Sequence, residues 1–164
     1  MRCLLVFILY IVNSFSFAAD LCTAGENVLF SCKLENTKKL VSLCQSQSEQ
    51  KRVFYKFGKL DQIDITLPSD SSPQPKISHE RFGPAITQWV EHIIFKNGDF
   101  LYVVSTLQGI SNSLNVYKGN RLIAKMGCQY QTETGLRVAE VVELLSSQSF
   151  KEDKKFCSFC SSPY

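Results

Sequence analysis

The stretch TQWVEHIIFKNGDFLYVVSTL, Thr87–Leu107, carries the clearest structural signal in this chain. Two runs rich in apolar and β-branched residues, Thr87–Phe95 and Phe100–Leu107, flank the polar sequence KNGD. Such runs suit the half-buried surface of a sheet. Asn-Gly between them is the strongest short hairpin signal, because both residues tolerate a positive φ. The stretch therefore predicts an antiparallel β-hairpin that turns at Asn97 and Gly98.

The same pattern extends in both directions from this hairpin. Downstream, Gly119-Asn120 joins LNVYK to RLIAKMGC and predicts a second hairpin. Upstream, the segments NVLFSCKL, KLVSLC, RVFYKF and QIDITL alternate between apolar and polar residues. In the first of them the alternation places one set of residues on one face: Val28, Phe30, Cys32 and Leu34. Seven or eight such strands predict a mainly β protein, an antiparallel meander that forms a small barrel or sandwich.

A segment rich in proline and serine, PSDSSPQPK at Pro68–Lys76, interrupts the strands. Proline cannot donate to a β-ladder, so we expect an exposed connection here. The composition does not change across it, which makes it a loop inside one domain. His79, just beyond the segment, is expected to be solvated.

The periodicity changes after Cys128. In GLRVAEVVELLSSQS, Val138, Val141, Val142 and Leu145 recur at helical spacing, and Thr134 is a candidate N-cap. This pattern predicts one C-terminal helix near 136–147. Its apolar stripe would lie on an open end or edge of the sheet and protect it from aggregation.

The N-terminal sequence MRCLLVFILYIVNSFSFAAD has the three parts of a secretory signal peptide: an Arg, an apolar run and small residues. The run is too short to span a bilayer. We expect cleavage after Ala18, which gives a signal peptide at 1–18, a single β-rich domain at 19–150 and a cysteine-bearing tail at 151–164. The expected product is exported without a membrane anchor. The periplasm is the first choice of compartment because no N-x-S/T glycosylation site occurs, and extracellular release is the alternative.

Six cysteines remain once Cys3 leaves with the signal peptide. An even number in an exported chain predicts a set of disulfides, whose pairing the sequence does not choose. Three lie early and three late, so a bridge between the two ends is expected. The candidates are Cys22, Cys32, Cys44, Cys128, Cys157 and Cys160.

The sequence FCSFC, Phe156–Cys160, separates Cys157 and Cys160 by two residues. A thioredoxin-type site places the first cysteine at the N-terminus of a helix, which lowers its pKa. Here the pair follows a helix and a charged tail, so a structural disulfide is favoured. His79 and His92 have no tight spacing to the cysteines, so no metal site is predicted. We also expect no cofactor.

Catalytic motifs are missing from the sequence. It contains no G-x-S-x-G, H-E-x-x-H or P-loop, and its carboxylates are scattered. His92 alternates with Val90 and Ile94 along a strand, which favours a packed or surface histidine over a general base. The chain is therefore expected not to be an enzyme. Its net charge of +3 is too small to indicate a nucleic-acid partner.

Three features are candidates for binding. Trp89 is the only tryptophan and is either a core residue or an aromatic anchor for a partner. The polar loop Gln108–Ser113 is carried on a rigid sheet, as binding loops are, although it can equally be a plain connection. A third feature is a basic segment that we interpret as a solvated face: Lys51, Arg52, Lys56 and Lys59.

The layout resembles that of small exported bacterial β-proteins of uncharacterised families, on the segments GENVLFSCKL, LVSLC, YKFGK and YKGNRLIAKMGC. The part Ser105–Cys128 is also loosely similar to periplasmic inhibitors of c-type lysozyme, in which a small β-barrel uses a loop bearing Ser and Lys to plug the target's cleft. This resemblance implies Ser111, Ser113 and Lys118 as binding residues. The expected C-terminal helix and the FCSFC tail depart from the inhibitor pattern.

The expected function is that of an exported, non-enzymatic binding protein with a protein partner in the envelope. Its action would be to inhibit or neutralise a cell-wall-degrading enzyme or a toxin. One alternative is a thiol-disulfide oxidoreductase that uses Cys157 and Cys160. The other is a structural envelope protein. The sequence does not predict an oligomeric state.

Overall fold

The computed structural model describes residues 19–48, 52–68, 75–82, 88–107, 111–129 and 141. In these ranges the chain forms nine β-strands, so the predicted mainly β, antiparallel class is confirmed with more strands than expected. Their bounds are β1 Glu26–Lys33, β2 Leu40–Ser46, β3 Val53–Lys59, β4 Gln62–Leu67, β5 Lys76–Phe82, β6 Gln88–Asn97, β7 Phe100–Leu107, β8 Ser111–Lys118 and β9 Arg121–Gly127.

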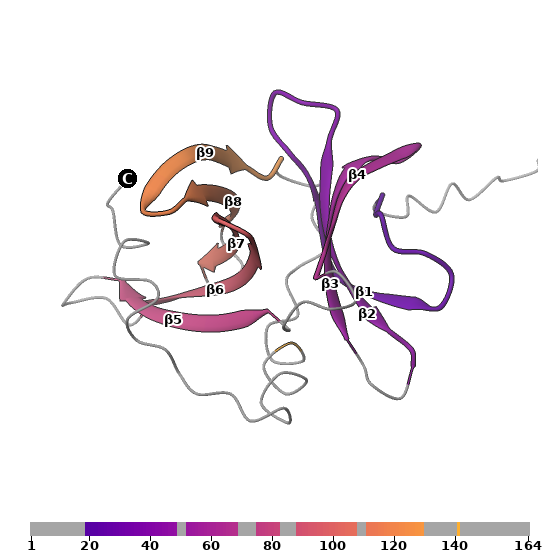
Figure 1. The fold of residues 1–164 in the computed structure, drawn as a ribbon, viewed down its shortest axis with the longest axis horizontal. Coiled ribbons are helices and arrows are strands. Elements are labelled where there is room, and N and C mark those ends of the chain that lie inside the picture. Colours follow the sequence, from indigo (N-terminus) through magenta and orange to yellow (C-terminus); the bar gives the residue numbers. More distant parts are fainter. Residues whose placement is uncertain are drawn as a thin grey trace, which may run out of the picture.

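The strands form two sheets. One has the order β1-β2-β3-β4 and the other β5-β6-β7-β8-β9, and within each sheet every strand pairs antiparallel with its neighbour in sequence. Figure 1 shows the first sheet, coloured indigo to magenta, beside the curved second sheet, coloured pink to orange. The meander is thus divided between β4 and β5, and the described strands do not form one closed barrel.

The hairpin predicted at Asn97-Gly98 is present as β6 and β7, but its turn lies one residue later. Asn97 is the last residue of β6 and pairs with Phe100, so Gly98 and Asp99 make the reversal. Gly98 has φ +57°, a conformation that glycine adopts without steric cost. The second predicted hairpin turns at Gly119-Asn120, as expected.

One hydrophobic core lies between the two sheets and takes side chains from both. Tyr55 on β3 is fully buried and meets two rings from the opposite sheet, with centroids 5.5 Å from Phe95 and 5.4 Å from Tyr102. Aromatic pairs at such separations add to the stabilisation that burial provides. Burial, with a smaller contribution from Tyr102, raises the pKa of Tyr55 far above its ordinary value.

The alternation expected in β1 is interrupted. Val28 pairs with Cys44 and Phe30 with Leu43, so Leu29 has no opposite residue on β2. Such a β-bulge breaks the period of two, and both Leu29 and Phe30 are fully buried. The expected single face is therefore wrong at Val28, which is half-buried, and holds for the other three residues.

The two sheets are joined at one corner, where the end of β1 meets the end of β9. Leu34 forms an isolated antiparallel bridge with Cys128. On either side, the Glu35 backbone N–H donates to the Gly127 carbonyl at 2.9 Å and the Gln129 N–H to the Lys33 carbonyl at 2.8 Å. The corner ties the first strand of the meander to the last one.

The segment Pro68–Lys76 differs from the expected exposed connection. Pro68 and Pro75 are both buried, because they stand directly beside strands whose ends reach the core. Residues 69–74 lie outside the described ranges. His79, expected to be solvated, lies in β5, where it pairs with Glu91 of β6. The extra strand β5 was missed because the proline segment obscured where it begins.

Several predictions concern residues outside the described ranges. These are the signal peptide at 1–18, the tail at 151–164 with its two cysteines, and the helix near 136–147 except for Val141. Val141 is fully buried in the core cluster. Among the residues that the structure describes, no helix is long and apolar enough to cross a bilayer.

Candidate functional site

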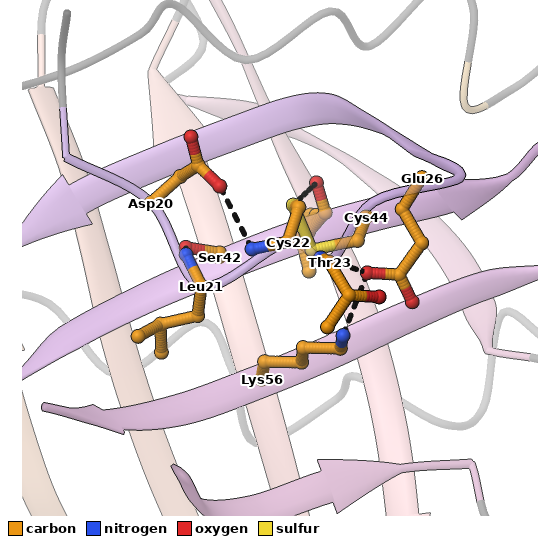
Figure 2. Close-up of polar contacts among 9 residues, drawn as sticks. Asp20, Leu21, Cys22, Thr23, Glu26, Ser42, Cys44 and Lys56 are labelled. Atoms are coloured by element: carbon orange, nitrogen blue, oxygen red, sulfur yellow. Dashed lines mark hydrogen bonds and ion pairs between the residues drawn. A yellow bond between two sulfur atoms is a disulfide. The ribbon is translucent and has the colours of Figure 1, made fainter. Parts of the chain in front are cut away.

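The chain from Ala19 to Thr23 crosses the face of β1–β3 that points away from the core, and we call it the strap (Figure 2). The Leu21 backbone N–H donates to Ser42 Oγ at 3.0 Å, and Leu21 itself is buried. Ser31 Oγ donates to the Ala19 carbonyl at 2.8 Å and lies 2.9 Å from Ser42 Oγ. Ser31 and Ser42 are neighbours in the β1–β2 register, so two facing strands position both hydroxyls beneath the strap.

A disulfide between Cys22 and Cys44 fastens the strap to β2. Cys44 is fully buried and Cys22 is half-buried. At the start of the strap, an Asp20 carboxylate oxygen accepts from the Cys22 backbone N–H at 2.8 Å. The strap is therefore held by one covalent bond and several hydrogen bonds over a short stretch of chain.

A nearly buried ion pair lies next to the disulfide. Lys56 Nζ on β3 is 2.6 Å from Glu26 Oε2, and the two side chains are 6 % and 13 % exposed. The same carboxylate oxygen accepts from the Thr23 backbone N–H at 2.6 Å. Figure 2 shows both contacts meeting at Glu26 beside the Cys22–Cys44 bond. The prediction that Lys56 belongs to a solvated basic face is wrong, because Glu26 and the strap cover it.

The environment of Glu26 acts on its pKa in both directions. Burial raises this pKa, but the hydrogen bonds from Lys56 and Thr23, together with the charge of Lys56, lower it by more. The net result is a pKa below the ordinary value, so the carboxylate is ionised at neutral pH.

The sulfur atoms of Cys22 and Cys44 and a carboxylate oxygen of Glu26 lie within 4.8 Å of one another. Three such groups can hold a zinc ion when the sulfurs are thiolates. Here the sulfurs are bonded to each other, so this cluster acts as a structural clamp.

A second disulfide joins Cys32 to Cys128, 96 residues apart in sequence. Both cysteines are buried in the core cluster, at the corner that links β1 to β9. The expected bridge between the early and late cysteines is confirmed. Four of the six candidate cysteines are thus paired, and the other two, Cys157 and Cys160, lie outside the described residues.

Sequence reasoning missed a buried polar pair on the second sheet. His92 Nδ1 on β6 lies 2.7 Å from Ser105 Oγ on β7, and the side chains are 4 % and 6 % exposed. The two residues are direct register partners, and Ser113 on β8 is the next partner of Ser105. A histidine beside a serine can activate a nucleophile, but at this depth the hydroxyl is shielded from a substrate. The sequence could have revealed this pair only through the alignment of the two strands of the β6–β7 hairpin, which sets His92 opposite Ser105.

The predicted binding residues of the inhibitor resemblance do not form one loop. Ser111, Ser113 and Lys118 all belong to β8, so the expectation of a polar loop reaching Ser113 is wrong. Ser111 and Lys118 stand at opposite ends of this strand, about 23 Å apart at the usual rise per residue. Ser111 and Lys118 are exposed and Ser113 is half-buried. Trp89 lies in β6 opposite Arg81 of β5, close to the start of the strand.

Two exposed apolar pairs stand at hairpins. Leu122 and Ile123 on β9 are each 44 % exposed, and Leu60 and Ile63 at the β3–β4 turn are 67 % and 41 % exposed. The first pair belongs to a group that we call the basic tip, which also contains exposed cationic residues of two hairpins. The basic tip consists of Lys96, Lys118, Arg121, Leu122, Ile123 and Lys125.

The two hairpins of the basic tip are fixed to each other. The Gly119 backbone N–H donates to the Asp99 carbonyl at 2.9 Å. Lys118 Nζ lies 5.6 Å from the centroid of the Phe100 ring, within the range of a cation–π contact. The turn β8–β9 therefore presents its charges from a rigid base.

Comparison of the chain with protein families, curated proteins and solved structures found no match. The described part defines the class without them: an antiparallel, two-sheet β-protein with two disulfides, of which one fastens an N-terminal strap and the other closes a corner of the core.

Proposed function

We propose that this chain is an exported, non-enzymatic protein that binds another protein through the basic tip. The observation that carries the proposal is the exposure of Leu122 and Ile123, 44 % each, among cationic side chains. Apolar residues at the centre of a polar rim are typical of protein interfaces. Export is supported by the two disulfides, which persist in oxidising compartments and are rare in the cytosol. The periplasm remains our first choice and extracellular release the second.

The charge of the basic tip favours a partner with an acidic surface. Four exposed cations, Lys96, Lys118, Arg121 and Lys125, lie on the same two hairpins as the apolar pair, and Asp99 is an exposed acid in one of their turns. Complementary charge steers encounter and suppresses wrong partners. A rigid tip of this kind suits a concave acidic site.

Cell-wall-degrading glycosidases are a partner class with such a site. Their active clefts carry a pair of carboxyl groups that flank the scissile bond. An ammonium group such as that of Lys118, presented from a tip with apolar neighbours, is complementary to this cleft. Ser111 and Ser113 stand towards the other end of β8, so the proposal depends on Lys118 and not on the two serines.

Inhibition of a cell-wall-degrading enzyme is the decisive test. The mature chain is titrated against a panel of muramidases, with lysis of a peptidoglycan suspension and binding affinity as readouts. We expect inhibition by the parent chain and a loss of at least about tenfold in affinity for L122S/I123S and for K118E. The matched control is L60S/I63S, which removes the other exposed apolar pair and should bind like the parent chain.

Three outcomes would contradict the proposal: no binding to any enzyme of the panel, equal affinity of L122S/I123S and the parent chain, or equal losses in L122S/I123S and L60S/I63S. A basic and apolar surface also suits an anionic membrane. Binding to vesicles of anionic phospholipid without binding to a protein would replace this proposal with a membrane one.

A further inference from the structure

Asn97 and Gly98, at the turn of the β6–β7 hairpin, form the single Asn-Gly pair in the chain. In such a pair the backbone nitrogen of the glycine can attack the side-chain amide carbon of the asparagine. Glycine has no Cβ atom to obstruct this approach. Asparagine is for this reason one of the thermolabile residues of proteins. The pair is therefore a candidate for spontaneous deamidation, and the structure decides whether the folded chain permits it.

The fold leaves both reacting groups accessible. Asn97 and Gly98 are exposed, and apart from its chain neighbours no atom lies within 4 Å of the place that a Cβ atom of Gly98 would take. Within the described part of the chain, neither the Asn97 side chain nor the Gly98 backbone N–H takes part in a hydrogen bond. The two groups can therefore meet without first leaving a partner, and water can reach them.

The backbone of Asn97 can also reach the conformation that the reaction needs. The attacking nitrogen and the amide carbon must approach to about 3–3.5 Å, and extended backbone keeps them further apart. Asn97 pairs with Phe100 at the last position of the β6–β7 ladder. The end of a ladder opens locally at a small cost in free energy. Rotation about the Asn97 backbone therefore disturbs one strand pair and leaves the rest of the hairpin intact.

We infer that Asn97 is a deamidation site, at which the basic tip gains a negative charge and an altered backbone. The Gly98 nitrogen forms a bond to Cγ of Asn97. The bond from Cγ to the side-chain nitrogen breaks, and ammonia leaves with the proton of the Gly98 N–H. The cyclic succinimide then takes up one water molecule. Opening at Cγ gives an aspartate, and opening at the backbone carbonyl gives an isoaspartate, in which the main chain runs through Cγ.

The products change the basic tip in two ways. Both add a carboxylate next to Lys96, in a turn that already carries the exposed Asp99, and so reduce the positive potential of the tip. The isoaspartate also adds one carbon to the main chain, and loop length fixes the geometry of a hairpin turn. It should displace Asp99, whose carbonyl accepts from the Gly119 N–H and fixes the two hairpins to each other. The consequence for a partner rests on the proposed function, whereas the reaction itself does not.

Ageing of the mature chain tests the site. The parent chain is kept in heavy-oxygen water at neutral to mildly alkaline pH, and peptide mapping follows each asparagine. Asn120 is the matched internal control, because it is exposed and lies in a two-residue hairpin turn but precedes Arg121. We expect Asn97 to convert at least about tenfold faster than Asn120. The product should contain oxygen from water and should be a mixture of aspartate and isoaspartate.

Two variants separate the charge from the change of backbone. N97D carries the new charge on an unaltered main chain, and N97Q keeps a neutral amide that forms the ring far less readily. Hydrogen exchange of the Gly119 N–H is measured for both variants and for the aged parent chain. Exchange should be faster in the isoaspartate form and close to that of the fresh parent chain in N97D and N97Q.

The inference fails if Asn97 converts no faster than Asn120, or if it converts only when urea unfolds the chain. Formation of aspartate without isoaspartate would exclude the succinimide route. Unchanged exchange of the Gly119 N–H in the isoaspartate form would refute the predicted change in the turn. Each readout uses the chain alone, so its outcome is distinct from the success or failure of binding to an enzyme.

Discussion

Lys56 Nζ lies 2.6 Å from Glu26 Oε2, and the two side chains are nearly buried beside the strap on the face of the first sheet that points away from the core. The pair joins β1 to β3 across the intervening strand β2. Its carboxylate also holds the Thr23 backbone N–H, so one residue connects the sheet to the strap. This relationship accounts for two of the predictions that follow.

Removal of one member of the pair should destabilise the chain strongly. K56M leaves the Glu26 carboxylate buried without its cation, and we expect the free energy of unfolding to fall by about 2–4 kcal/mol. The double variant E26L/K56M, which leaves no unpaired charge, should recover part of this loss. Urea unfolding measures each variant, and K59M, at an exposed lysine on the same strand, is the control with a change below about 0.5 kcal/mol. Equal effects of K56M and K59M would refute the buried pair.

The lowered pKa of Glu26 makes a prediction about acid stability. A carboxyl group with a pKa below its unfolded value, 4.5 for a glutamate, stabilises the fold above that value. The contribution is lost as the pH falls below 4.5 and through the folded-state pKa. The difference in unfolding free energy between the parent chain and E26Q should therefore be constant near neutral pH and shrink in acid. A difference that grows on acidification would contradict this assignment.

The two disulfides should contribute unequally. The Cys22–Cys44 bond spans 22 residues and the Cys32–Cys128 bond spans 96. In the chain-entropy model these loops correspond to about 3 and about 5 kcal/mol. C32S/C128S should therefore have the lower midpoint in urea, and its effect is increased because Cys32 and Cys128 are buried in the core. A lower midpoint for C22S/C44S would show that the strap contributes more than the corner.

Gly58 should tolerate no side chain. Its φ is +155°, and a Cβ atom there would collide with the backbone carbonyl of Gln62. Backbone cannot move aside without disturbing the β3–β4 pairing, so G58A should cost more than about 2 kcal/mol in thermal or urea unfolding. G127A is the matched control, because the nearest atoms there belong to the flexible Glu35 side chain. Equal costs of G58A and G127A would contradict the assignment.

Parts of the fold could be predicted because they depend on local sequence. The hairpins at Gly98 and Gly119 follow from glycine at positions of positive φ between apolar runs. β5 was harder to predict, because three prolines precede it and no tight turn signal in the sequence joins it to β6, the strand with which it pairs. The bulge at Leu29 was also missed, since an unmatched residue leaves the apolar pattern of β1 almost unchanged.

The candidate sites were less predictable than the strands. Lys56 looks like a member of a basic run, and only the fold brings Glu26 to it from 30 residues away. The same holds for His92 and Ser105, which become neighbours through the register of β6 and β7. Exposed residues such as Leu122 have no distinctive sequence signal, because alternation predicts burial for half the residues of any strand.

The antiparallel β class, the two later hairpins and the set of cysteines available for pairing follow from the amino-acid sequence alone. These features depend on side-chain periodicity and on turn residues, which act over a few positions. Three other features arise only when the whole chain is folded: the division into two sheets, the pairing of Cys22 with Cys44 and of Cys32 with Cys128, and the burial of Lys56. Those features depend on which distant segments share one face, and that is set by the register of whole strands and the packing of one sheet on the other.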